Sequence, residues 1–295
     1  MLTQLFNQDH AKGWRSSVAN TDWKSFAETL IRGLHDRGEQ TMILVDELAL
    51  FVAALLKKNP QAAREFLYGL RALQQSYPNV RWLFTGSIGL DTVARRGDLA
   101  GALVDLQSYP LGPLSREAAR AYIDHLAATG KVMHPFCLDD AAFAAFAEGL
   151  GWLAPYYVEQ VALLMRPTGA LNAGGLRTAS EANVAAAFDA ILRPEYRTYF
   201  VTWEEHLSNN FKPAEAASMR RVLDVCARQP AGEQPDTIFA RLGGPLTGPK
   251  RKALKDQLNT LAADGFLEAV GEGDSERFRF RSGLLRRYWQ RYMGE

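Results

Sequence analysis

The chain has 295 residues, which is enough for two or three small domains. Hydrophobic residues make up 47% and charged residues 23%, so the composition excludes a disordered, collagenous or coiled-coil protein. The formal net charge is +1, which gives no overall field that would attract nucleic acid or a membrane surface. Any such partner therefore has to meet a local charged patch.

The location follows from the apolar runs and the cysteines. The longest uninterrupted apolar run, 48–56, is far shorter than the ~20 residues that span a bilayer, so we expect no membrane partner. Cys137 and Cys226 are the only cysteines and lie far apart in the sequence. This excludes a disulfide framework and a zinc site built from cysteines. We therefore expect a cytoplasmic protein.

Two runs in the first third predict strands. Residues 41–45 read TMILV, a continuous apolar run that suits a strand buried on both faces, and residues 80–85 read VRWLFT. A third, weaker strand is expected at 104–109. The helical patterns of this region cover 22–36, 48–57 and 60–75. The alternation of strands and helices predicts an α/β sheet within residues 1–111.

The middle of the chain, 112–200, predicts a helical domain without strands. Ser115, Asp139 and Ser180 precede helical patterns and have the side chains preferred at helix N-caps. Residues 201–212 predict a connecting helix, which we assign to a third domain at 201–295.

The end of the chain predicts three helices and a β-hairpin. The helical patterns cover 214–228, 235–242 and 249–264. Residues 265–270 and 277–281 then form two strand-like runs on either side of a Gly-rich turn, and the second run alternates strictly. Three helices followed by a two-stranded hairpin are typical of a winged-helix domain.

The first predicted strand ends in two adjacent carboxylates, Asp46 and Glu47. The carboxyl ends of parallel strands are where α/β sheets bind ligands. There an aspartate can hold Mg²⁺, and the next glutamate can polarise a water for attack on a γ-phosphate. The alternative is that Asp46 only caps the helix that begins at Leu48.

The segments TMILVDE and VRWLFTGS together resemble the Walker B and sensor-1 strands of AAA+/STAND-like P-loop ATPases. The segments SIGLDTVARRGDL and GLGWLAPYYVEQVALLMR resemble the sensor-1 region and the helical lid of that family. The closing RFRFRSGLLRRYWQRY resembles its winged-helix end. The resemblance implies a partial P-loop NTPase (AAA+-like) parallel sheet, followed by a mainly α-helical lid and a C-terminal winged helix.

The resemblance also implies roles for single residues, with ATP and Mg²⁺ as cofactors. Asp46 would order Mg²⁺ and Glu47 would be the general base, while Thr85 or Ser87 would be the polar sensor of the γ-phosphate. Arg95 and Arg96 lie about where the family places an arginine that reaches a neighbour's nucleotide. The alternatives are a strand-end hydroxyl that bonds to nearby backbone at Thr85, and ordinary surface arginines at 95 and 96.

The sequence departs from this family at its phosphate-binding loop. The motif Gly-x4-Gly-Lys-Ser/Thr, which follows the first strand of a P-loop ATPase, does not occur in the 295 residues. The family's sheet order places the missing strand beside the 80–85 strand, whose open edge would be costly. We expect a fragment of a longer ATPase; the alternatives are strands from another protomer and a reduced sheet. The chain alone is expected not to hydrolyse ATP.

The C-terminal module supports a rival function, a non-enzymatic DNA-binding regulator or a protein-interaction adaptor. Residues 245–295 hold ten basic and seven acidic residues. A positive face on the third helix and the hairpin could contact DNA phosphates. The alternatives are a solvated face and packing against a protein partner. The candidate DNA-binding residues are Lys250, Arg251, Lys252, Lys255, Arg277 and Arg279.

Overall fold

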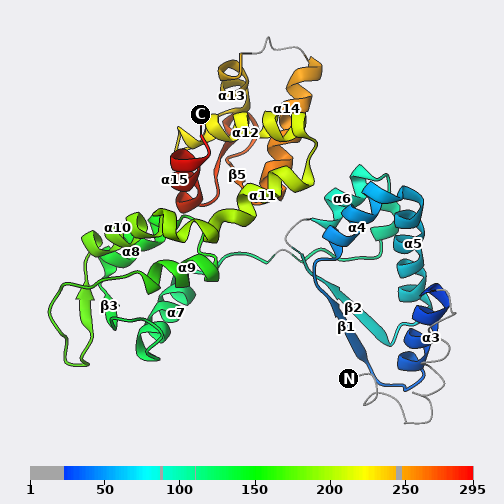
Figure 1. Cartoon of the computed structure of the whole chain (residues 1–295), viewed down its shortest axis with the longest axis horizontal. Helices are drawn as coiled ribbons and strands as arrows, with labels where there is room; N and C mark the ends of the chain where they lie inside the picture. Colours follow the sequence, from blue (N-terminus) through cyan, green and yellow to red (C-terminus); the bar gives the residue numbers. More distant parts are fainter. Residues whose placement is uncertain (1–22, 87–88, 110, 244–247, 295) are drawn as a thin grey trace. The chain divides into compact units, whose positions relative to one another are not determined.

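The computed structural model describes residues 23–86, 89–109, 111–243 and 248–294. The chain divides into two compact units, 1–108 and 109–295 (Figure 1). The first unit holds a parallel strand pair with helices, and the second is mainly helical. The chain is thus α/β followed by mainly α, as the sequence predicts.

The strand pair of the first unit forms where the apolar runs predict it. Strand β1 (Thr41–Val45) pairs in parallel with β2 (Val80–Phe84), with Ile43 opposite Trp82. The connection between them contains α4 (Leu48–Lys58) and α5 (Pro60–Ser76). Asn59 caps α5, because its side chain accepts a hydrogen bond from the backbone N–H of Ala62 at 3.1 Å.

The helices of the first unit cover one face of the strand pair. Helices α3 (Trp23–His35) and α5 contact β2, and Ile31, Leu34 and Val80 form a small core there. A second small core joins α4, α5 and α6 (Leu90–Arg96). On the other face, the side chains of Met42, Leu44 and Leu83 are 63%, 69% and 46% exposed, so the expectation that the 41–45 strand is buried on both faces is wrong for the described residues.

The strand predicted at 104–109 is wrong. A 3₁₀ helix, η1 (Ala100–Leu103), is followed by a turn and by residues without regular structure. Arg71 of α5 explains this conformation, since its guanidinium bonds the Asp105 carboxylate at 2.6 Å and the Gly101 carbonyl at 3.1 Å. These bonds hold the segment against α5. Within the described part of the first unit, the sheet therefore has two strands.

The second unit begins with four helices: α7 (Arg116–Ala128), α8 (Asp140–Leu150), α9 (Pro155–Leu163) and α10 (Glu181–Ile191). Ser115, Asp139 and Ser180 cap α7, α8 and α10 as predicted. The prediction of no strand between 112 and 200 is wrong.

The helical region also contains a short parallel strand pair, β3 (Phe136–Leu138) and β4 (Arg177–Ala179). Three-residue strands are too short to show a period of two in the sequence. Phe136, Leu138 and Ala179 are buried in the helical core, which fixes the pair.

The rest of the second unit contains the predicted helices and hairpin. After η2 (Pro194–Phe200) the order is α11 (Val201–Asn210), α12 (Pro213–Ala227), α13 (Pro235–Arg241) and α14 (Gly248–Ala263). The antiparallel strands β5 (Leu267–Val270) and β6 (Arg277–Phe280) follow, separated by η3 (Gly273–Ser275), and α15 (Gly283–Tyr292) closes the chain.

A single hydrophobic core in the second unit contains buried residues from both 112–200 and 201–295. The Phe200 ring stacks on Tyr288 with centroids 4.2 Å apart and on Tyr157 at 5.7 Å. Helices α8 and α15 also approach closely, since a Cβ on Gly283 would lie 2.7 Å from the Gly149 carbonyl oxygen. The elements of 112–200 and 201–295 therefore pack as neighbours, and their separation into two domains stays a prediction.

Candidate functional site

Asp46 and Thr85 meet at the carboxyl end of the β1–β2 pair. The Thr85 hydroxyl donates a hydrogen bond of 2.6 Å to Asp46 Oδ1. The Thr85 backbone N–H also donates to the Val45 carbonyl at 3.0 Å, which extends the ladder one residue past the strands. Parallel pairing brings the two strand ends together, so Asp46 and Thr85 lie side by side, and their roles at a nucleotide stay predictions.

Glu47 follows in a tight turn that starts α4. Its backbone lies in the left-handed region, with φ 55° and ψ 30°, which costs roughly 1–2 kcal/mol for a residue with a Cβ. Asp46 Oδ1 offsets part of this cost, because it accepts the Glu47 N–H at 3.0 Å. Glu47, and not Asp46, occupies the N-cap position of α4. The Asp46 carboxylate thus accepts hydrogen bonds from both the Glu47 N–H of the turn and the Thr85 hydroxyl.

The oxygens at this site suit a hard cation. Asp46 and Thr85 are exposed and Glu47 is half-buried, so all three are accessible from solvent. Carboxylate and hydroxyl oxygens match the preference of Mg²⁺, which usually keeps several waters and phosphate oxygens as further ligands. No group of three or more His, Cys, Asp or Glu residues in the described part of the chain could hold a metal ion by itself. A role of Asp46 in ordering Mg²⁺ that arrives with a nucleotide stays a prediction. Ser87 lies outside the described residues.

The two candidate arginines lie in the last turn of α6. Arg95 pairs with the carboxylate of Asp91 one helical turn earlier, and both side chains are 66% exposed. Arg96 is also exposed. Val93 and Ala94 anchor the helix in the small core with α4. A role for either arginine at a neighbouring molecule's nucleotide stays a prediction.

The six basic candidates of the C-terminal module divide into two groups. Three of them form ion pairs: Arg251 with Asp236, Lys255 with Glu276, and Arg279 with Glu268. Lys250, Lys252 and Arg277 form no ion pair with the residues that the structure describes. The candidate DNA-binding face is thus partly neutralised by its own chain.

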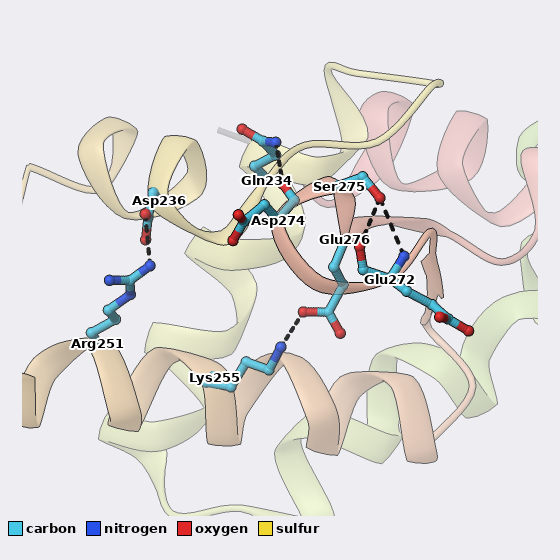
Figure 2. Close-up of polar contacts among 8 residues, drawn as sticks. All are labelled: Gln234, Asp236, Arg251, Lys255, Glu272, Asp274, Ser275 and Glu276. Atoms are coloured by element: carbon cyan, nitrogen blue, oxygen red, sulfur yellow. Dashed lines mark hydrogen bonds and ion pairs between the residues drawn. The ribbon is translucent and has the colours of Figure 1, made fainter.

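A cleft of about 760 Å³ lies between α13, α14 and the hairpin loop 271–276. Its walls carry charges of both signs, and Figure 2 shows the Arg251–Asp236 and Lys255–Glu276 pairs within it. Sequence reasoning counted Glu276 among the acidic residues of 245–295 but did not pair it, and Asp236 lies before that range. The pairs join residues 15 and 21 positions apart on different elements, so no local pattern indicates them.

Comparison with known proteins supports the fold. No family model matches the sequence, and no curated protein matches it. The structure is similar to the Walker-type ATPase paby2304 of Pyrococcus abyssi, with a TM-score of 0.62 and 14% sequence identity. The match covers 92% of this chain and 69% of that one. The chain therefore has a P-loop ATPase-like α/β fold. Within the described residues, no helix has both the length and the apolar character needed to cross a membrane.

Proposed function

We propose that this chain is a module of an AAA+/STAND-like ATPase, an ATP-dependent molecular switch, and that it supplies the Walker B and sensor residues. The observation that carries the proposal is the Asp46–Thr85 hydrogen bond at the carboxyl end of the strand pair, with Glu47 as the next residue. The P-loop ATPase-like fold supports it. We assign residues 112–200 to the helical lid and the end of the chain to a winged helix.

Each residue at the strand ends has a definite task under this proposal. Mg²⁺ bound with ATP would neutralise the charge that develops on the phosphates. The Asp46 carboxylate orders that ion, directly or through a water. The Glu47 carboxylate accepts a proton from the attacking water, and the Thr85 hydroxyl reports the state of the phosphate through its bond to Asp46.

The phosphates themselves need a further element. Backbone N–H groups and a lysine hold them in a P-loop ATPase, and the motif for that loop does not occur in this sequence. We propose that a P-loop segment of a longer polypeptide, or another protomer, completes the site. An in-frame strand followed by a Gly-rich Gly-Lys-Ser/Thr loop in the DNA upstream of Met1 would identify the first source.

Phosphate release from Mg-ATP tests the proposal. We expect no turnover by the purified chain of 295 residues. Joined to a P-loop segment from its own reading frame, or mixed with the protomer that carries one, the chain should hydrolyse ATP. Glu47→Gln should then abolish turnover and keep nucleotide binding. Turnover by the chain alone that Glu47→Gln abolishes would contradict the need for a second element. Unchanged turnover in Glu47→Gln of the completed site would contradict the assigned base.

A second candidate function, duplex DNA binding, has support of its own. Lys250 and Lys252 lie exposed near the start of α14, the last of the three helices that precede the hairpin. This is the helix that a winged-helix domain places in the major groove. We expect salt-sensitive duplex binding that weakens in a Lys250→Ala/Lys252→Ala variant. Binding that is absent, or insensitive to salt and to this change, would favour an adaptor that contacts only protein.

A further inference from the structure

Two basic side chains of α14, Arg251 and Lys255, bond to carboxylates of the same module. Arg251 and Lys255 lie one helical turn apart on α14, and in Figure 2 both extend from the same side of the helix. Arg251 Nη2 bonds Asp236 Oδ2 on α13 at 2.8 Å. Lys255 Nζ bonds Glu276 at the end of the hairpin loop. The two bonds therefore connect α14 to both elements on the far side of the cleft.

The position of Glu276 is set by the backbone around it. The Phe278 N–H donates to the Glu233 carbonyl at 2.9 Å, and the Glu233 N–H donates back to Phe278 at 3.0 Å. The Gln234 side chain also donates to the Asp274 carbonyl at 2.8 Å (Figure 2). These bonds fix the hairpin loop to the segment before α13. The fixed loop therefore places Glu276 opposite Lys255 on α14.

The pairs are exposed enough to be exchanged. The side chains of Arg251 and Asp236 are 64% and 50% exposed, and those of Lys255 and Glu276 are 42% and 24% exposed. Ion pairs at such positions contribute little to stability, so a phosphate can compete for the cation. The carboxylate stays in place after the exchange, however, and repels the phosphate. Each pair therefore weakens the contribution of its cation to phosphate binding.

We propose that Asp236 and Glu276 form a carboxylate mask over the basic face of α14, an autoinhibitory contact that lowers the affinity of the module for duplex DNA. The mask rests on the second candidate function, and it is independent of ATP hydrolysis. Lys250 and Lys252 stay outside it and provide the initial attraction to phosphate. Arg251 and Lys255 contribute less to binding while their carboxylates are charged, and their full contribution appears when those carboxylates are neutralised.

Duplex binding by the full chain, measured by fluorescence anisotropy over a range of salt concentrations, tests the mask. Glu276→Gln and Asp236→Asn are each expected to bind about three- to tenfold more tightly than wild type near 0.1 M salt. The slope of log K against log salt should steepen by about 0.9 for each released cation. Adding Lys255→Gln to Glu276→Gln should remove the gain.

Asp274→Asn is the matched control. Asp274 lies in the same hairpin loop and lines the same cleft, and its carboxylate is in no ion pair within the described residues. The control changes the net charge by the same amount, so a general electrostatic effect would move both variants equally. The mask predicts a steeper salt slope in Glu276→Gln and an unchanged slope in Asp274→Asn.

The outcomes separate the hypotheses. Equal behaviour of Glu276→Gln and Asp274→Asn, or a gain that survives Lys255→Gln, would overturn the mask and leave DNA binding intact. If wild type, Glu276→Gln and Asp236→Asn all fail to bind duplex DNA, both the mask and the DNA-binding function are overturned. Thermal melting of each variant checks folding, and Asp236→Asn provides a second test through a different element of the cleft. Phosphate release from Mg-ATP bears on the ATPase proposal alone.

Discussion

The two units differ in how completely they bury their apolar residues. In the first unit, Met42, Leu44 and Leu83 form an exposed apolar face on a parallel strand pair. In the second unit, Phe278 and Trp289 are buried in one continuous core. Parallel sheets are normally covered on both faces. The comparison indicates that the second unit is built around one continuous core, although single apolar side chains such as Met133 and Leu171 are exposed. The unit with Asp46 and Thr85 has an apolar strand face that further polypeptide could cover.

The largest expected effect comes from Trp289, in the core of the second unit. Its ring is 1% exposed, and its indole N–H donates to Asp224 Oδ1 at 2.7 Å. Trp289→Ala should lower the free energy of unfolding of this unit by about 3–5 kcal/mol, because it leaves a cavity and removes the hydrogen bond to Asp224. Urea unfolding followed by far-UV circular dichroism measures the change. A loss below 1 kcal/mol would mean that the core of the second unit is not tightly packed.

The next effect is the pH dependence of the second unit above pH 9. Burial, with a smaller contribution from the charge of Glu233, raises the pKa of the Cys226 thiol from 9.0 to about 12. Between these values the unfolded thiol ionises and the folded thiol stays protonated, so stability present below pH 9 is lost as the pH rises. The loss should reach about 2–3 kcal/mol by pH 11.

Cys226→Ala provides the control for this pH dependence. Tyr288, whose pKa burial and a bond to Glu204 raise to about 12, is present in both chains and cancels in the comparison. Urea unfolding at several pH values from 8 to 11 should show that the free energy of unfolding falls less steeply with pH in Cys226→Ala than in wild type. Identical slopes in the two chains would show that the thiol is accessible to water and that this part of the core is open.

A smaller effect is expected at the candidate site in the first unit. Thr85→Val keeps the shape of the side chain and removes the bond to Asp46, so it should cost about 1 kcal/mol. Thr85→Ser keeps the hydroxyl and should restore most of the loss. Hydrogen exchange of the β1 and β2 amides reports on this unit alone. Equal protection in wild type and Thr85→Val would show that the bond does not stabilise the strand ends.

The parts of the fold that sequence predicts are those with a strong local pattern. The apolar run at 41–45 and its acidic end at Asp46 indicate a strand and a site, and parallel pairing then brings in Thr85. The conformation of 104–109 depends on Arg71, which lies 34 residues before Asp105. The apolar residues of this segment therefore indicate a strand that does not form. The β3–β4 pair is too short to have a period.

The charge pattern of α14 shows the same limit. Its basic residues are plain in the sequence, and their number suggests a phosphate-binding face. Whether a cation is available depends on which carboxylates the fold brings to it, and Asp236 and Glu276 come from other elements. The contact between Asp46 and Thr85 can be predicted from the sequence, because each follows a predicted strand and parallel pairing brings the two strand ends together.

The smallest expected change in stability is at the exposed face of the first unit, where Leu44→Thr should alter the free energy of unfolding by less than about 0.5 kcal/mol. Val80→Thr, on the covered face of the same strand pair, should cost about 1–3 kcal/mol because it buries a hydroxyl. Since exposed apolar faces promote association, Leu44→Thr should also lower self-association in sedimentation velocity. If the two substitutions cost equally, Leu44 is covered in solution, and the difference between the units is smaller than their burial indicates.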